Sequence, residues 1–229
     1  MKKIQRSGTR PGKTAYGLMI ALAMIAGATT VNAQIGTGWT HISPSTHIVV
    51  SSTGSGYHMN YPGSSTSISD GGGRYTYVNG IRTFQLLDTS RNRVEFVFDD
   101  FYSDKRQLQL TAMVSSPANN ESILQLFCHQ PDGPYLLIKE SNSSSGSLRV
   151  VGDGVTTSTT IATGIYGVWV RLNTIHNKSA NLTQVYVNGT KKFQQGWGPG
   201  TSYYDKFGCY GTLTTSSAKI QFKSVTYFK

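Results

Sequence analysis

Four side chains, spread over three short segments, are of types that could together carry out acid–base chemistry. They are Arg93, Gln125, His129 and Tyr210. Arginine and a side-chain amide neutralise a carboxylate by charge and hydrogen bonding. A histidine or an ionised tyrosine can then remove a neighbouring proton, and a tyrosine can protonate a departing glycosidic oxygen. If the fold brings them to one surface, the chemistry that these residues suit is elimination across a uronic acid.

The segments around these residues alternate as β-strands do, because successive strand side chains point to opposite faces. The pattern is clear in residues 93–99, 107–114, 123–129 and 204–210. The positions predicted to face inward are Val94, Phe96, Phe98, Leu108, Leu110, Ala112, Val114, Leu124, Leu126, Cys128, Phe207 and Cys209. The other side carries Arg93, Glu95, Asp99, Gln107, Gln109, Thr111, Gln125, Phe127, His129, Tyr204, Lys206 and Tyr210. A side so rich in hydrogen-bonding groups indicates a binding surface.

Composition and strand spacing predict an all-β fold. Glutamate is scarce while Gly, Ser, Thr, Tyr and Val abound, which favours strands and turns over long helices. Asn188-Gly189 is a two-residue hairpin signal, and two closing strands are predicted at 220–222 and 225–228. We therefore expect a single domain over residues 34–229, a β-jelly roll of two antiparallel sheets of the concanavalin-like kind.

Residues 1–33 have the pattern of a secretory signal peptide. Five basic residues and no acidic one precede an apolar run from Tyr16 to Ala28, and the small-residue sequence Val31-Asn32-Ala33 follows. A membrane anchor is the alternative, but it needs about 20 apolar residues. Cleavage would reduce the formal charge from +10 to +5, because 16 basic and 11 acidic residues remain. We expect a secreted or periplasmic monomer that contacts no membrane after cleavage and no nucleic acid, and whose charge attracts an acidic polysaccharide.

The two cysteines, Cys128 and Cys209, lie on the apolar side of predicted strands. Because an exported protein can form disulfides, they either pair inside the core or lie there as free buried thiols. No Cys/His spacing suggests a zinc site, and no phosphate-binding loop is present. The sequence therefore predicts no metal ion and no cofactor.

Three short motifs carry a resemblance to a known family. Residues 204–210, YDKFGCY, resemble the YxKxGxY signature of the jelly-roll alginate lyases of polysaccharide lyase family 7. RVE at 93–95 resembles the start of that family's RTELR motif, and QLF at 125–127 stands where its QIH or QVH is expected. The segments RYTYVNGIR, RQLQ, VWVRLNTIHN and VYVNGTKKF are similar to the glucuronan lyases of family 20 and to plant citrate-binding-type proteins.

The resemblance implies a polysaccharide lyase that cleaves a β-1,4-linked polyuronate, alginate or glucuronan. It implies that Arg93 and Gln125 bind the uronate carboxylate and that Tyr210 is the catalytic acid. It also implies that Lys206 and Tyr204 line the subsite. We expect Glu95 and Gln107, which lie on the same polar side, to contact the substrate as well. Phe127 departs from the family, because it occupies the position of the catalytic His. The base is then either His129, two residues further on, or Tyr210 itself with the help of a neighbouring cation.

Two other functions fit the same fold. A non-catalytic carbohydrate- or carboxylate-binding protein would use the same polar side and would not need the missing His. A glycosidase would need two carboxyl groups about 5–9.5 Å apart. Glu95 and Asp99, the best pair on one face, would be about 13 Å apart along a strand. The glycosidase is therefore the weakest of the three hypotheses.

Overall fold

The computed structural model describes residues 34–51, 56–60, 66–102, 105–116, 118, 120–130, 132–196, 200–211 and 217–229. The signal peptide predicted for residues 1–33 lies outside this part of the chain. Residues from Asn32 to Lys229 form one compact unit. Nowhere in the described residues is there a helix with the length and apolar character that a membrane crossing requires.

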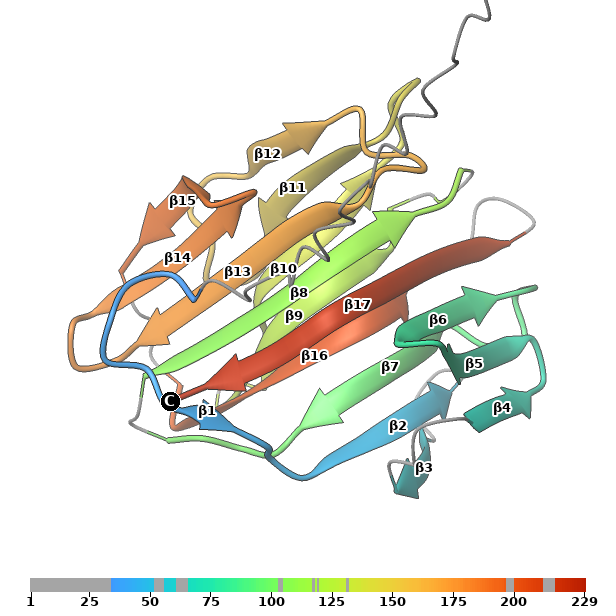
Figure 1. Cartoon of the computed structure of the whole chain (residues 1–229), viewed down its shortest axis with the longest axis horizontal. Coiled ribbons are helices and arrows are strands. Elements are labelled where there is room, and N and C mark those ends of the chain that lie inside the picture. Colours follow the sequence, from blue (N-terminus) through green and yellow to red (C-terminus); the bar gives the residue numbers. More distant parts are fainter. Residues whose placement is uncertain are drawn as a thin grey trace, which may run out of the picture. The chain divides into compact units, whose positions relative to one another are not determined.

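The described residues form strands arranged in two antiparallel sheets (Figure 1), as the strand pattern predicts. Sheet A has the order β15 (Thr190–Gln195), β14 (Leu182–Val187), β13 (Val170–Asn177), β8 (Arg106–Val114), β17 (Ala218–Phe228), β6 (Ile81–Leu86), β5 (Gly73–Val78) and β4 (Thr66–Asp70), and β1 (His41–Ile42) also pairs with β17. Sheet B has the order β12 (Thr159–Thr163), β11 (Ser147–Val151), β10 (Gly133–Ser141), β9 (Ser122–His129), β16 (Ser202–Tyr210), β7 (Arg93–Phe98), β2 (Thr46–Ser51) and β3 (Gly56–Asn60).

The core lies between the sheets and contains the apolar positions of each strand. All the residues predicted to face inward are at most 5% exposed. Phe207 of sheet B stacks on Phe96 at 5.1 Å and meets Phe84 and Phe222 of sheet A edge-on at 5.6 and 5.0 Å. Such aromatic packing contributes about 0.5–1.5 kcal/mol per pair beyond the burial of area. Since one side of each strand is buried between the sheets, the polar residues of sheet B lie on its opposite side. We call this side the outer face of sheet B.

Turn geometry confirms one local prediction and corrects another. Asn188 and Gly189 have φ of 51° and 85°, as a tight hairpin between β14 and β15 requires. The two predicted closing strands are one strand, β17, which continues through a bulge where Ser224 has φ of 52°. A bulge inserts an unpaired residue without ending a strand, so the interrupted alternation suggested two strands.

Both cysteines are buried in the core and form no disulfide with each other, which decides between the two alternatives above. Burial raises the pKa of each thiol, Cys209 more strongly than Cys128. A thiol that is buried and protonated is a poor nucleophile. The cysteines therefore act as small apolar core residues rather than as reactive groups.

Gly208 lets β16 approach β7 closely. It pairs with Glu95, and a Cβ at this position would overlap the Val94 carbonyl oxygen and lie 2.7 Å from the Glu95 Cα. Both neighbours are backbone atoms that cannot rotate away. We therefore expect Gly208→Ala to separate the strands and to lower the free energy of unfolding by about 1–3 kcal/mol in urea titration. The matched control is Gly196→Ala, because Gly196 is not among the left-handed glycines and the nearest atoms to a Cβ there, those of the Asn181 side chain, are at least 3.4 Å away. Equal effects of the two substitutions would contradict this role for Gly208.

Candidate functional site

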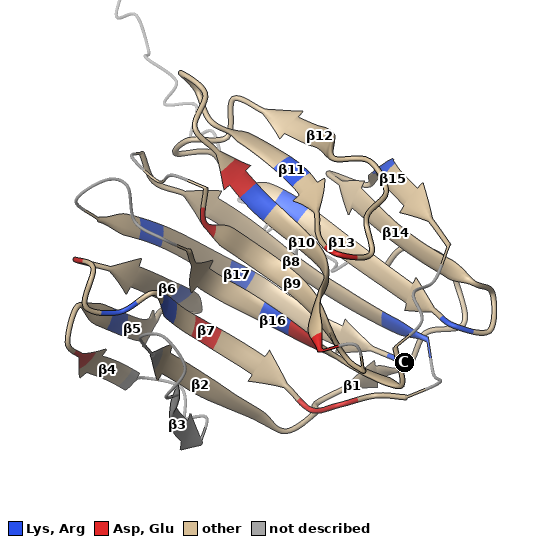
Figure 2. Ribbon diagram, turned by 180° about the vertical axis from the view of Figure 1, so that it is seen from behind, with Lys and Arg blue, Asp and Glu red and all other residues tan. Residues whose placement is uncertain are grey.

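Three of the four polar segments are neighbours in the middle of sheet B. β16 pairs with β9 on one side and with β7 on the other. Lys206 lies opposite Gln125 of β9, and Tyr210 lies opposite Arg93 of β7. Residues paired directly across strands point to the same face. Arg93, Glu95, Gln125, Lys206 and Tyr210 thus share the outer face of sheet B, and we call them the polar cluster; Figure 2 shows acidic and basic positions on β7 and β16.

Glu95 lies at the centre of the polar cluster. Its side chain is almost fully buried, and the Nε2 of Gln125 donates a hydrogen bond to its Oε1. Its Oε2 is 3.9 Å from Nη1 of Arg93. Burial raises the pKa of the Glu95 carboxyl, although Lys206, Arg93 and the Gln125 hydrogen bond act in the opposite direction. The buried Glu95 carboxylate therefore orients the side chains of Gln125 and Arg93. Because it is buried, Glu95 is a positioning residue rather than the substrate contact that was expected.

Arg93 and Tyr210 form the part of the polar cluster that is open to solvent. The guanidinium carbon of Arg93 lies 4.3 Å from the centroid of the Tyr210 ring. Both residues are partly exposed, the Arg93 side chain by 25%. A planar guanidinium stacked on an aromatic ring keeps its donors directed to the side, where they can bind a carboxylate in a forked geometry. A cation for an anionic ligand and a phenol for proton transfer are therefore adjacent.

Phe127 stands at the position where the motif that it resembles has a histidine. Lys206 lies in front of its ring. Its Nζ is 4.2 Å from the centroid of the Phe127 ring and 5.0 Å from that of Tyr204. The residue is 6% exposed, and burial lowers the pKa of its amine while Glu95 raises it. Burial likewise raises the pKa of Tyr204. In the middle of the outer face, the Lys206 amine therefore lies over the aromatic rings of Phe127 and Tyr204.

The Glu95 and Lys206 charges balance each other in a buried setting. We expect Glu95→Gln to lower the free energy of unfolding by about 1–3 kcal/mol, because buried Lys206 loses its acidic neighbour. Lys206→Met should lower the free energy of unfolding by less when it is added to Glu95→Gln than when it is made in the wild-type protein. A double-mutant cycle by urea unfolding measures the difference, for which we expect a coupling of about 1 kcal/mol or more. Strictly additive effects would show that the two charges act independently.

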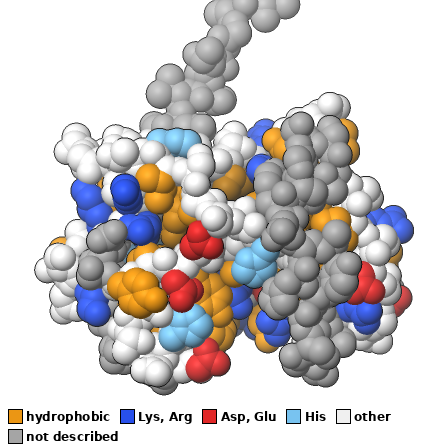
Figure 3. All heavy atoms as spheres, turned by 90° about the horizontal axis from the view of Figure 1, so that it is seen from below, with side chains coloured by type: hydrophobic (Ala, Val, Ile, Leu, Met, Phe, Trp, Pro, Cys, Tyr) orange, Lys and Arg blue, Asp and Glu red, His pale blue; other side chains and the backbone are white. Residues whose placement is uncertain are grey.

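His129 lies far from Tyr210, and its placement corrects its assignment as the partner base. It is opposite Ser202, eight residues before Tyr210 on β16, which corresponds to about 26 Å along the strand. Its Nε2 is 3.5 Å from Oδ2 of Asp100 and its Nδ1 is 3.8 Å from Oδ1 of Asp132. Figure 3 shows that histidine and acidic side chains lie side by side on one face of the molecule. Side chains of this separation cannot act on one sugar ring.

Gln107 is also apart from the polar cluster, contrary to the expectation that it contacts the substrate there. It belongs to β8, in sheet A, and it is fully buried. Its Nε2 donates to the carbonyl oxygen of Ile35, and its Oε1 accepts from the amide of the same residue. Gln107 therefore fixes the segment before β1 against sheet A.

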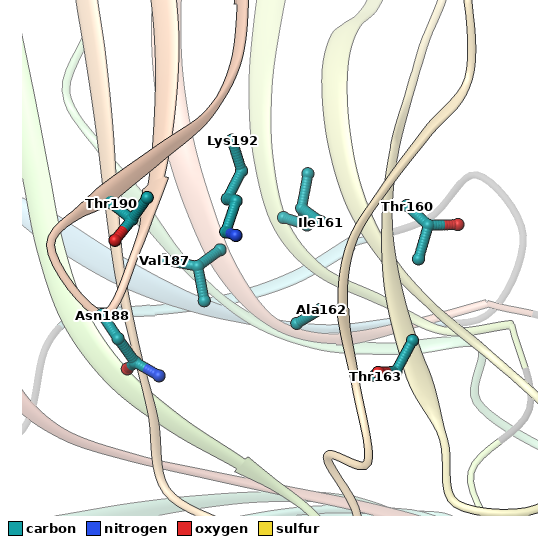
Figure 4. A pocket seen from close by; sticks show the side chains of 8 residues that line it. All are labelled: Thr160, Ile161, Ala162, Thr163, Val187, Asn188, Thr190 and Lys192. Carbon is teal, nitrogen blue, oxygen red and sulfur yellow. The ribbon is translucent and has the colours of Figure 1, made fainter.

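A shallow pocket lies elsewhere, between one edge of each sheet (Figure 4). It has a volume of about 480 Å³ and is formed by β12 and the β14–β15 hairpin. Its lining residues are Thr160, Ile161, Ala162, Thr163, Val187, Asn188, Thr190 and Lys192. None of them belongs to the polar cluster. Lys192 is the one charged residue in this lining, which contains no acid–base pair.

Solved structures of alginate lyases share this architecture. A PL7 alginate lyase from Zobellia galactanivorans superposes with a TM-score of 0.60 at 15% identity, over 80% of this chain and 94% of its own. An alginate lyase from Pseudomonas aeruginosa gives 0.64 at 14% identity, over 80% and 97%. The chain has the alginate lyase fold. The predicted jelly roll of two antiparallel sheets is therefore confirmed, and at these identities the likeness extends to the fold alone.

The sequence comparisons are weaker than the structural ones. No protein-family model matches the chain. A curated protein from Hevea brasiliensis, described as a citrate-binding protein, is 25% identical over 169 residues, which cover 68% of either chain.

Proposed function

We propose that the protein is a polysaccharide lyase that cleaves a 1,4-linked polyuronate by β-elimination on the outer face of sheet B. The observation that carries this proposal is the stacking of the Arg93 guanidinium on the Tyr210 ring at 4.3 Å, on the open part of the polar cluster. This contact places a group that can bind a carboxylate next to a group that can transfer a proton. The fold shared with alginate lyases adds support, as does the net positive charge of two cations against one carboxylate in the cluster.

The chemistry begins with the carboxylate of the bound uronate. Arg93, assisted by the Gln125 amide that Glu95 orients, neutralises this carboxylate and so acidifies the adjacent C5–H. Tyr210, as the phenolate, removes the C5 proton, and the C5–H electron pair forms a C4=C5 double bond while the C4–O bond breaks. The phenol then returns the same proton to the departing oxygen. No water molecule is consumed.

A single residue that is both base and acid restricts the substrate. Tyr210 lies on one side of the sugar, so it must take the C5 proton and protonate the leaving oxygen from that side. In mannuronate and glucuronate these two groups are on the same side of the ring, whereas in guluronate they are on opposite sides. With His129 about 26 Å away along the strand, we propose mannuronan or glucuronan as the substrate and exclude guluronan.

Ultraviolet absorbance of the unsaturated uronate product tests this proposal. Purified protein is incubated separately with mannuronan, guluronan and glucuronan. We expect absorbance to rise with mannuronan or glucuronan and to stay flat with guluronan. Cleavage of guluronan alone would overturn the role of Tyr210 as the only acid–base group.

The second candidate function is a non-catalytic carboxylate-binding protein. Two observations favour it: Phe127 stands at the position of the family's base, and the Hevea brasiliensis relative is described as citrate-binding. Retention on immobilised mannuronan without any absorbance change would support this candidate. Citrate in the elution buffer then distinguishes recognition of a small carboxylate from recognition of a polymer.

His129 provides a prediction of small effect. We expect His129→Ala to change kcat/KM on mannuronan by less than about threefold, because the residue lies too far from Tyr210 to share a sugar ring with it. Absorbance kinetics measures the change. A loss comparable with that of a Tyr210 variant would return His129 to the catalytic machinery.

A further inference from the structure

We propose that Lys139 and Arg149 form a second carboxylate-binding subsite, so that the polyuronate lies across the strands of sheet B from β7 to β11. This inference rests on the proposed function, from which it takes the class of its ligand. The sequence motifs assign neither residue to a site.

The hydrogen-bonding register places these residues in one row with the polar cluster. Arg93 is opposite Tyr210, and Tyr210 is opposite Ser122. Ser122 is opposite Lys139, and Lys139 is opposite Arg149. Five neighbouring strands therefore each contribute one residue to a single row that runs perpendicular to the strands. Three of the five residues are cations.

The two added cations point to the same outer face as Arg93 and Tyr210. Their strand neighbours Ile138 and Leu148 are buried in the core, so Lys139 and Arg149 face outward. Arg149 is exposed and Lys139 is half-buried. Figure 2, which views this side, shows basic positions on both β10 and β11.

Like charges directly opposite each other destabilise a sheet. Lys139 and Arg149 are such a pair, and the hydrogen bond that the Arg149 Nη2 donates is to a neutral group, the Ser158 hydroxyl, at 2.7 Å. Burial lowers the pKa of the Lys139 amine, and the buried acid Glu121 acts in the opposite direction. A bound carboxylate between the two cations would relieve their repulsion, which is a physical reason for the pair to lie on a ligand-binding face.

The spacing of the row sets the length of chain that can use it. Neighbouring strands are about 4.8 Å apart, so Lys139 lies three strand spacings, about 14 Å, from Arg93, and Arg149 lies about 19 Å away. One uronate unit of a 1,4-linked chain is about as long as one strand spacing. A chain must therefore have at least about four units to contact Arg93 and Lys139 together, and a dimer cannot.

The test compares Lys139→Met/Arg149→Gln with a control of equal charge change on sheet A, Lys191→Met/Lys219→Gln. Each protein, the wild type included, is titrated calorimetrically with mannuronate oligomers of two and six units and with matched glucuronate oligomers. All the proteins carry Tyr210→Phe, so that the oligomers are bound without being cleaved during the measurement. We expect the first double variant to bind hexamers roughly tenfold to a hundredfold more weakly, and dimers as the wild type does. The control variant should match the wild type for both lengths. Thermal unfolding of each variant establishes that the fold is kept.

Two outcomes overturn the subsite. Either hexamer binding is unchanged in the double variant, or hexamer and dimer binding fall by the same factor. The failure of the lyase proposal looks different, because the wild type would then bind oligomers, with the same dependence on Lys139 and Arg149, and yield no unsaturated product. Wild-type protein that binds neither kind of oligomer would refute both.

Discussion

Tyr210→Phe is expected to lower kcat on mannuronan or glucuronan by about a thousandfold or more while binding stays nearly unchanged. The substitution removes only the hydroxyl, which is the group proposed to take the C5 proton and to protonate the leaving oxygen. General acid–base catalysis contributes about a hundredfold to ten-thousandfold per transfer, and here one group makes both transfers. The Phe ring can still stack under Arg93, so the carboxylate site remains in place.

Tyr204→Phe is the matched control, since it lies on the same strand and the same face. Its ring contacts Phe127 at 5.2 Å and Lys206 at 5.0 Å, and both contacts survive loss of the hydroxyl. We expect kcat within about threefold of the wild type, because the residue lies about 20 Å along the strand from Tyr210. Initial absorbance rates with saturating substrate measure both variants. If Tyr210→Phe keeps wild-type turnover, another group is the acid and base.

Arg93→Lys is the second large effect, although it preserves the charge. Lysine cannot form the forked pair of hydrogen bonds to a carboxylate, and it lacks the planar group that stacks on Tyr210. The lost stabilisation applies to the transition state, where negative charge accumulates on the uronate. We expect kcat/KM to fall by about a hundredfold or more.

Arg91→Lys is the control for Arg93. Arg91 lies two residues earlier, and its Nη2 is 2.8 Å from Oδ1 of Asp70, outside the polar cluster. We expect this variant to keep kcat/KM within about twofold, since a partly exposed ion pair contributes little. Similar losses in both variants would mean that Arg93 acts through stability rather than through the substrate, and urea unfolding would then show it.

The alternation of apolar and polar residues predicted the strands and the buried side of each. The strands β7, β16 and β9 are neighbours in sheet B, so their outward residues Arg93, Gln125, Lys206 and Tyr210 share a face. The three short motifs suggested this grouping, because they follow one another in the same order as in the family that they resemble. The same alternation could not tell which sheet a strand joins. Gln107 has the same pattern as Gln125, but β8 pairs with β13 and β17 in sheet A. Sheet membership depends on long-range pairing that periodicity does not encode.

Register explains the other differences between sequence and structure. His129 is two residues from Phe127, but β9 is antiparallel to β16, so each step toward His129 is a step away from Tyr210. Lys139 and Arg149 are ten residues apart in sequence, and only the pairing of β10 with β11 makes them neighbours. The burial of Glu95 depends on the side chains around it. The sequence showed that these strands carry outward-facing charges among apolar residues. It could not show which of those charges lie next to one another.

Digestion of mannuronan and glucuronan in water labelled with heavy oxygen tests the central claim most directly. β-Elimination breaks the C4–O bond without adding water, so each new chain end is either an unsaturated uronate or an unlabelled sugar. Mass spectrometry of the products is therefore expected to find shorter chains with no label introduced by cleavage, after correction for exchange at the reducing end in untreated oligomers. New non-reducing ends that are saturated rather than unsaturated would show hydrolysis, and full-length, uncut polymer would show that the protein does not cleave it; either result would contradict the proposal.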